Sequence, residues 1–220
     1  MATTRTAGSA PRTPLTTERV LVAAIALADA GGIESLSMRK LAHELGYEVM
    51  SLYNHVANKD EVVRSIVDRV VAAIDVAADE ADWKRGIRRT AISAREVLLG
   101  HPWVLDVWWR VDSGPARLAL LESLLHRLHN AGLSQAVAHH GYHAVLMHIL
   151  GFTVQERNYP SGDADIAVLA AAFLQQFPQE TYPNFTRHVV EHVERTVTRS
   201  GFEFVLDMII DGLERADHQD

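Results

Sequence analysis

The absence of proline from residues 15–101 is the feature that most constrains the fold of this chain. The seven prolines stand at positions 11, 14, 102, 115, 160, 178 and 183, and apolar residues recur between them with the helical period of about 3.6. Alternation of apolar and polar residues, the pattern of a strand, is nearly absent. Proline disrupts a helix anywhere beyond its first turn, so a long stretch without proline can be helical throughout. Together with the helical period of the apolar residues, this predicts an all-α fold.

Capping residues and glycines predict where the helices begin and end. Thr16 or Thr17 can cap a first helix, which the glycine pair at 31–32 ends. Ser37 caps a second helix that ends at Gly46. Further helices are predicted at about 49–55, from the cap at Asn58 to about Ala78, and at about 82–99, 102–110, 115–131, 134–157, 163–176, 184–199 and 201–216.

Composition excludes several classes of protein. The chain has 220 residues, no cysteine and a net charge of −7, so disulfide scaffolds, thiolate metal sites and thiol nucleophiles are ruled out. Residues 1–60 hold six basic and six acidic side chains, and residues 61–220 therefore carry the whole excess of acid. No apolar run approaches the roughly 20 residues that span a bilayer, and the N-terminus does not resemble a secretory signal. We expect a cytoplasmic protein without a membrane partner.

The run SMRKLAHELGYEVMSLYNHVANKDE, from Ser37 to Glu61, is the most informative segment. A short helix, a glycine-containing turn and a second short helix form a helix-turn-helix. The second helix is too short to be stable alone, so neighbouring helices must hold it. Its outward polar and aromatic residues suit a DNA major groove, where asparagine can pair with adenine and serine or tyrosine can bond phosphate. The alternative is an ordinary solvated corner between two helices.

Residues 17–62 resemble the N-terminal DNA-binding domain of the TetR/AcrR transcriptional repressors. The matching pieces are the glycine pair after the first helix, the run LSMRKLAHELG, and the run SLYNHVANKDEVV, which is similar to the family signature LYxHFxxKxxLL. Tyr53, His55 and Lys59 stand at the tyrosine, histidine and lysine of that signature. Val56 replaces the common phenylalanine, which is typical of the tetracycline-repressor branch.

The resemblance implies roles for individual residues. Ser37 matches a phosphate contact, Arg39 a contact to phosphate or guanine, and Lys59 a phosphate contact at the start of the fourth helix. Val49 and Met50 depart from the polar residues often found at the base-reading positions, so they either touch thymine methyl groups or partly face inward. The predicted DNA contacts are Ser37, Arg39, Val49, Met50, Ser51, Tyr53, Asn54, His55 and Lys59.

The chain divides into three predicted parts: a disordered tail at 1–14, a three-helix helix-turn-helix domain at 15–62, and a helical effector-binding and dimerisation domain at 63–220. The run SGFEFVLDMIIDGLE resembles the last helix of tetracycline-repressor-like C-terminal domains, in which two late helices of each subunit form a four-helix bundle. A homodimer is favoured because one recognition helix contacts too few base pairs, although packing inside the monomer is the alternative. The predicted interface residues are Phe202, Val205, Leu206, Ile209, Ile210 and Leu213.

The resemblance also implies a cavity for a small, apolar or aromatic effector. The candidate residues mix aromatic and polar side chains, as binding pockets do, although any single tryptophan or methionine can equally be plain core. The candidates are Trp103, Trp108, Trp109, Tyr142, His143, Met147, Phe152, Gln155 and Phe173. Tetracycline repressors hold a magnesium–drug chelate with a histidine on the sixth helix, and the stretch 106–109 has no histidine, so we expect a different effector.

Two histidine pairs, His139 with His143 and His188 with His192, have the spacing that can hold a metal. Neither pair has a carboxylate or thiol partner at fixed spacing, so we predict no metal and no cofactor. The predicted function is a repressor that a small effector releases from a palindromic operator on double-stranded DNA. The alternatives are a DNA-binding regulator without a small effector and a helical enzyme, which is disfavoured because the chain has no phosphate loop, HExxH or nucleophile elbow.

Overall fold

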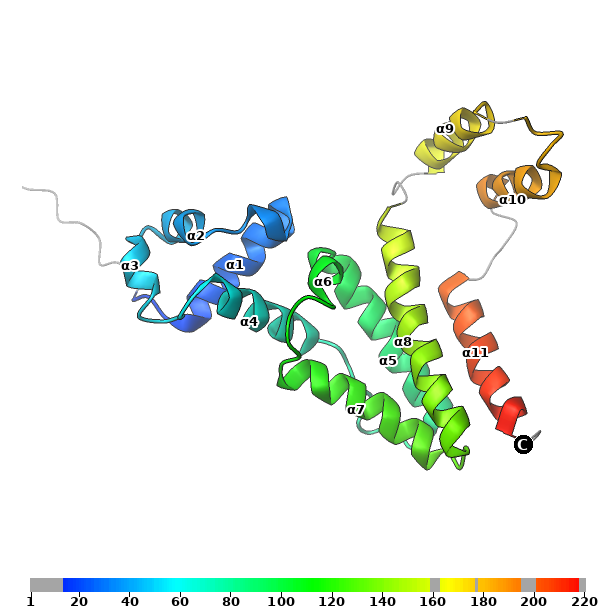
Figure 1. The fold of residues 1–220 in the computed structure, drawn as a ribbon, viewed down its shortest axis with the longest axis horizontal. Helices are drawn as coiled ribbons and strands as arrows, with labels where there is room; N and C mark the ends of the chain where they lie inside the picture. Colours follow the sequence, from blue (N-terminus) through cyan, green and yellow to red (C-terminus); the bar gives the residue numbers. More distant parts are fainter. Residues whose placement is uncertain (1–13, 159–162, 177, 195–200, 218–220) are drawn as a thin grey trace, which may run out of the picture. The chain divides into compact units, whose positions relative to one another are not determined.

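The computed structural model describes residues 14–158, 163–176, 178–194 and 201–217, which form helices joined by turns and loops (Figure 1). Within these ranges there is no β-strand, which confirms the predicted all-α fold. The predicted tail at 1–14 lies, except for Pro14, outside the described residues.

The chain forms two compact units, residues 1–66 and 67–220. From residue 14 onward, the first unit contains three helices, a short 3₁₀ turn and the start of a fourth helix: α1 (Thr17–Gly31), η1 (Ile33–Ser35), α2 (Met38–Leu45), α3 (Val49–Leu52) and α4 (Lys59–Val71). Apolar residues three or four apart on these helices are buried, as an amphipathic helix requires. The buried set includes Val20, Ala24, Leu27, Ala28, Leu41, Ala42, Leu52, Val56, Val62 and Ile66.

The second unit is built around α8, which packs on α5, α7 and α11 (Figure 1). Its helices are α5 (Trp83–Gly100), α6 (Trp103–Val107), α7 (Pro115–Asn130), α8 (Gln135–Arg157), α9 (Asp163–Leu174), α10 (Pro183–Glu194) and α11 (Gly201–Asp217). The α9 and α10 helices pack on each other. The core of the packed helices includes Ile87, Ala91, Ala94, Leu98, Leu120, Leu124, Leu128, Val145, Ile149, Phe202, Leu206 and Ile210.

The predicted caps of the first unit are confirmed. The Thr16 side chain accepts a hydrogen bond from the Arg19 amide at 3.2 Å, and the Ser37 side chain accepts one from the Lys40 amide at 3.2 Å. Each satisfies one of the amides that a helix start leaves without a partner. Gly46 ends α2 in the left-handed conformation with φ of 73°, where a side chain would be strained.

Three predicted helix ends were wrong. The α3 helix stops at Leu52 instead of His55, because the amides of Asn54 and His55 bond to carbonyls only three residues back and tighten the chain into a turn. The α4 helix stops at Val71 instead of Ala78, and the Asp75 carboxylate instead accepts the Ala77 amide at 2.8 Å. Such local side-chain bonds compete with the helix ladder.

The third wrong end belongs to the helix predicted at 102–110. This helix is α6, which ends at Val107, and residues 108–110 form a turn closed by the bond from the Arg110 amide to the Val107 carbonyl at 2.9 Å. The 3₁₀ turn η1 was not predicted. The last residues of the helix predicted at 184–199 lie outside the described residues from 195 onward.

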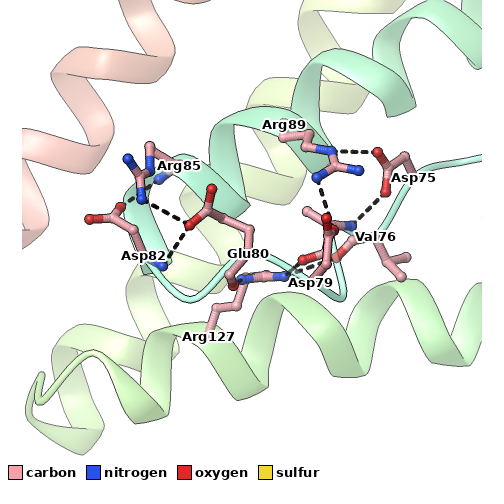
Figure 2. Close-up of polar contacts among 9 residues, drawn as sticks. Asp75, Val76, Asp79, Glu80, Asp82, Arg85, Arg89 and Arg127 are labelled. Atoms are coloured by element: carbon pink, nitrogen blue, oxygen red, sulfur yellow. Dashed lines mark hydrogen bonds and ion pairs between the residues drawn. The ribbon is translucent and has the colours of Figure 1, made fainter.

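Arg127 of α7 holds the connection between α4 and α5 in place by hydrogen bonds (Figure 2). Its Nη1 donates to the Glu80 carbonyl at 2.8 Å, and its Nη2 donates to the carbonyls of Val76, at 3.1 Å, and Ala77. A Cβ atom on Gly86 of α5 would stand 2.1 Å from the Arg127 Nη1, so glycine there leaves room for the guanidinium. Arg127 therefore supplies hydrogen-bond donors to three carbonyls of this irregular loop, one of which, that of Ala77, also accepts the Glu80 amide at 2.9 Å.

Candidate functional site

The helix-turn-helix is positioned by the turn between α2 and α3. The amides of Gly46 and Tyr47 both bond back to α2 carbonyls, with Tyr47 reaching the Ala42 carbonyl at 2.9 Å. This closes the C-terminus of α2 and fixes the direction in which the chain leaves it. Leu52, which is fully buried, then anchors α3 against α2.

Anchoring by Leu52 leaves the rest of α3 and the following turn at the surface. Met50 is 74% exposed, and Tyr53 and Asn54 are exposed too, whereas Val49, Ser51 and His55 are half-buried. Met50 therefore faces outward, and of the two apolar residues at the predicted reading positions only Val49 is partly covered. The His55 carbonyl accepts a hydrogen bond from the Thr17 hydroxyl at 3.3 Å, which ties the end of the turn to α1.

The start of α4 has the predicted cap at Asn58. The Asn58 side chain accepts from the Glu61 amide at 2.8 Å, and the Glu61 carboxylate reaches back to the Ala57 amide. The second bond goes to the residue before the cap, and the two bonds together fix where α4 begins. Lys59, half-buried, is the first residue of α4, and Ser37 and Arg39 at the start of α2 are exposed.

The nine candidate effector residues do not form one group. Trp103 and Trp108 are buried, Trp109 is 68% exposed, and Tyr142 is half-buried. Phe152 packs instead on His148 and Phe202, with ring centroids 5.4 Å and 5.5 Å away. The others are exposed on α8 and α9: His143, Met147, Gln155 and Phe173, the last with its ring 5.8 Å from that of Phe185.

Arg117 of α7 lies against the rings of Trp108 and Trp109 and interacts electrostatically with Tyr142, and we call these four residues the Arg117 cluster. The guanidinium carbon lies 4.5 Å from the centre of the Trp108 ring and 6.0 Å from that of Trp109. Burial lowers the pKa of Arg117, and the negative form of Tyr142 opposes that shift. Burial also raises the pKa of Tyr142.

Arg117 was missed by the sequence analysis. An arginine two residues after a helix-starting proline is ordinarily a solvated residue of the first turn, and no spacing or motif marks it. It is instead only 6% exposed, with its Nη1 donating to the Val111 carbonyl at 3.2 Å. Two neighbouring aromatic rings at 108 and 109 were the one available signal.

Asp68 of α4 caps α7 from outside that helix. The residue at the cap position is Gly114, which has no side chain, and the Asp68 Oδ1 accepts from the amides of Ala116 at 2.9 Å and Arg117 at 3.1 Å. A Cβ atom on Gly114 would stand 2.3 Å from the Asp68 Oδ1, so only glycine admits the carboxylate. The backbone of Arg117 is thus bonded to α4, while its side chain enters the Arg117 cluster.

Comparison with known proteins identifies the family of this chain. Residues 20–66 match the domain described as bacterial regulatory proteins of the tetR family, and residues 77–216 match the tetracyclin repressor-like C-terminal domain. The chain belongs to the TetR family. The second match also confirms that the C-terminal part is of the tetracycline-repressor type.

Three similar proteins are informative. The repressor DrrR1 of Streptomyces coeruleorubidus is 37% identical over 127 residues, which are 56% of this chain and 47% of DrrR1. ActR of Streptomyces coelicolor in complex with actinorhodin is 28% identical with a TM-score of 0.76, over 93% of this chain and 97% of ActR. BioQ with its double-stranded DNA operator is 25% identical with a TM-score of 0.63, over 91% of this chain and 98% of BioQ. The chain spans about half the length of the curated relatives it matches first.

In this TetR-family chain the six predicted interface residues divide among three degrees of exposure. Phe202, Leu206 and Ile210 are buried in the monomer, Ile209 and Leu213 are half-buried, and Val205 is exposed. Phe204 and Met208, on the same outer side of α11 as Val205, are exposed as well and were not predicted.

Among the described residues no group of three or more potential metal-binding side chains forms, and no helix is long and apolar enough to cross a membrane. The His139 and His143 rings lie 4.8 Å apart in an edge-on contact. The side chain of His192 lies outside the described residues.

Proposed function

We propose that this TetR-family chain is a dimeric transcriptional repressor that a small effector releases from a palindromic DNA operator. DrrR1 is named as a transcriptional repressor, BioQ has been solved with its DNA operator, and ActR has been solved with actinorhodin. The helix-turn-helix and the C-terminal domain match the same family along nearly the whole chain.

The exposed surface of α3 is the observation that supports DNA binding. Leu52 is fully buried, while Met50, Tyr53 and Asn54 are exposed on the turn and helix that it anchors. A rigid backbone with free polar and aromatic side chains is what base and phosphate contacts require. The proposed contacts are Ser37, Arg39, Val49, Met50, Ser51, Tyr53, Asn54, His55 and Lys59.

Dimerisation is supported by the outer side of α11, where Phe204, Val205 and Met208 are exposed. Exposed large apolar side chains that lie together mark contact surfaces. A twofold pair of recognition helices reads two half-sites about one DNA turn apart, which gives specificity that one short helix lacks.

The proposed response to an effector is supported by two contacts of Arg117, one made by its side chain and one by its backbone. Its side chain belongs to the Arg117 cluster, and its amide bonds to Asp68 on α4, the helix that begins at Lys59. An effector that binds this cluster more tightly in one arrangement of α4 and α7 shifts the equilibrium toward that arrangement. We propose that the shifted arrangement of α4 weakens operator binding.

Selection of bound fragments from the host genome by the full-length protein tests this function. We expect a short palindrome whose half-sites are centred about 10 base pairs apart or a multiple of that spacing. Footprinting of the selected site should then show two protected half-sites related by symmetry. Enrichment of sequences without a palindrome, or no enrichment, contradicts the proposal.

A further inference from the structure

Arg117 is a buried cation without an anion. It is 6% exposed, and among the described residues its guanidinium pairs with no Asp or Glu. Its Nη1 has the Val111 carbonyl, but its buried Nε has no acceptor. Because arginine stays protonated at neutral pH, it cannot relieve the cost of burial by losing its charge.

Other buried or half-buried arginines of the same unit are satisfied within the protein. Arg95 forms two hydrogen bonds to the Glu156 carboxylate, one of them of 2.7 Å from its Nε. Arg127, whose Nε also lacks an acceptor, donates to three backbone carbonyls of the α4–α5 connection (Figure 2). These contacts explain both residues as structural, whereas Arg117 has a single carbonyl and two aromatic rings.

Trp108 offers a second buried donor beside Arg117. Its indole Nε1 is buried without an acceptor, and its ring lies under the Arg117 guanidinium carbon at 4.5 Å. Native proteins rarely leave such donors without a partner, so an unpaired one requires an explanation. Among the described residues, the Arg117 Nε and the Trp108 Nε1 therefore both lack an acceptor, although the two side chains lie against each other.

We propose that the effector is a planar aromatic acid whose carboxylate or phenolate accepts hydrogen bonds from the Arg117 Nε and the Trp108 Nε1. The anion neutralises the buried guanidinium, and a charged acceptor forms stronger bonds with both donors than a neutral one. The aromatic frame stacks on the neighbouring rings, of which Trp109 is exposed and Tyr142 half-buried. This inference rests on the proposed function, since it names the chemical class of the effector.

The position of Arg117 also gives the acid a route to α4. The Arg117 amide and the Ala116 amide share the Asp68 Oδ1, so a ligand that moves the start of α7 changes this cap directly. A neutral ligand that does not bind the guanidinium does not move the first turn of α7 in this way. The acid should therefore bind more tightly and also release the operator more effectively.

A matched pair of probes tests the proposal: anthraquinone carboxylate and anthraquinone carboxamide, which share a ring system and differ in charge. Binding to the full-length protein is followed by tryptophan fluorescence and by thermal shift, with chloride added to equalise ionic strength. We expect the acid to bind at least about tenfold more tightly than the amide, as a charge-assisted hydrogen bond implies.

Variants assign the preference to its residues. Arg117→Gln should remove the difference between acid and amide, and Trp108→Phe, which keeps a ring but loses the N–H, should reduce it. Arg85→Gln, which removes an exposed arginine outside the cluster, should leave the difference unchanged. If Arg117→Gln does not fold, Trp108→Phe carries the test alone, because it removes one of the two proposed donors and keeps the charge of Arg117.

Equal responses to acid and amide, including no response to either, overturn the acidic effector, as does a preference that survives in Arg117→Gln. Operator binding is measured on the same samples, so the two proposals fail separately. A neutral compound that releases the operator leaves the proposed function standing without this inference. If the protein prefers the acid but binds no operator, the proposed Arg117 site stands and the proposed repressor function fails.

Discussion

At the scale of single residues, Asp68 shows how one carboxylate serves two helices. It lies in α4, yet it caps α7, because Gly114 has no side chain for that purpose. The sequence predicted caps that lie next to their own helices, such as Ser37 and Asn58, since their partners are three residues away. It did not predict Asp68 or Arg117, whose partners are brought together only by the tertiary fold.

Replacing Asp68 by alanine should lower the stability of the second unit by about 1 kcal/mol, the usual loss on removing a helix cap. Two amides, those of Ala116 and Arg117, lose their acceptor. Urea unfolding followed by circular dichroism measures the change. Asp68→Asn is the control, because its amide oxygen still accepts and most of the stability should remain. Equal losses in both variants would show that the charge of Asp68, and not its cap, stabilises the fold.

At the DNA-binding surface, Lys59→Ala should weaken operator binding and reduce the salt dependence of the affinity by about one unit of slope, since one phosphate contact is lost. Tyr53→Ala should weaken binding as well, with a smaller change in slope, because tyrosine is neutral. Fluorescence anisotropy with the selected operator at several salt concentrations measures both. Val22→Ala, at an exposed position of α1, should change neither the affinity nor the slope. Unaltered affinity in Lys59→Ala contradicts its phosphate contact.

At the scale of helices, the sequence predicted the existence of every α-helix of the described residues, and it predicted poorly where some of them end. The apolar period continues beyond Val71, and Ile74 and Ala77 are indeed buried, but in a loop held by Arg127 and Asp75. A buried apolar residue in a loop has the same spacing as one in a helix, so periodicity alone cannot separate them.

Gly86→Ala tests the role of that loop. A Cβ atom would stand 2.1 Å from the Arg127 Nη1, and the displaced guanidinium would lose its bonds to the carbonyls of the α4–α5 connection (Figure 2). Overpacking of this kind costs about 1–3 kcal/mol, so the midpoint of thermal unfolding should fall by several degrees.

Gly100→Ala is the matched control for Gly86→Ala, since it lies on the same helix with open space around its Cβ position. It should be neutral or slightly stabilising, because alanine favours a helix more than glycine does. A fall in the unfolding midpoint as large as that of Gly86→Ala would mean that α5 tolerates no added methyl group, and the contact with Arg127 would not explain the result.

For the whole molecule, the distribution of charge agrees with a division of roles. The excess of acid lies entirely in residues 61–220, and residues 1–60, which include the N-terminal tail, carry no net charge. A DNA-binding unit without excess positive charge gains little from the phosphate backbone alone, so non-specific binding is weak. In the proposed repressor, specificity then depends on two recognition helices acting together, and we therefore propose that the dimer is needed for operator binding.

Val205→Glu combined with Met208→Glu tests the dimer. Both side chains are exposed on α11, so the change leaves the buried Phe202, Leu206 and Ile210 in place, whereas truncating α11 would remove that core. Charges in an apolar interface are costly, and we expect a folded monomer by light scattering with at least about tenfold weaker operator binding. Asp211→Asn, at an exposed position of the same helix, is the control and should remain a dimer. A double variant that stays dimeric and binds its operator normally would show that the two copies meet through another surface.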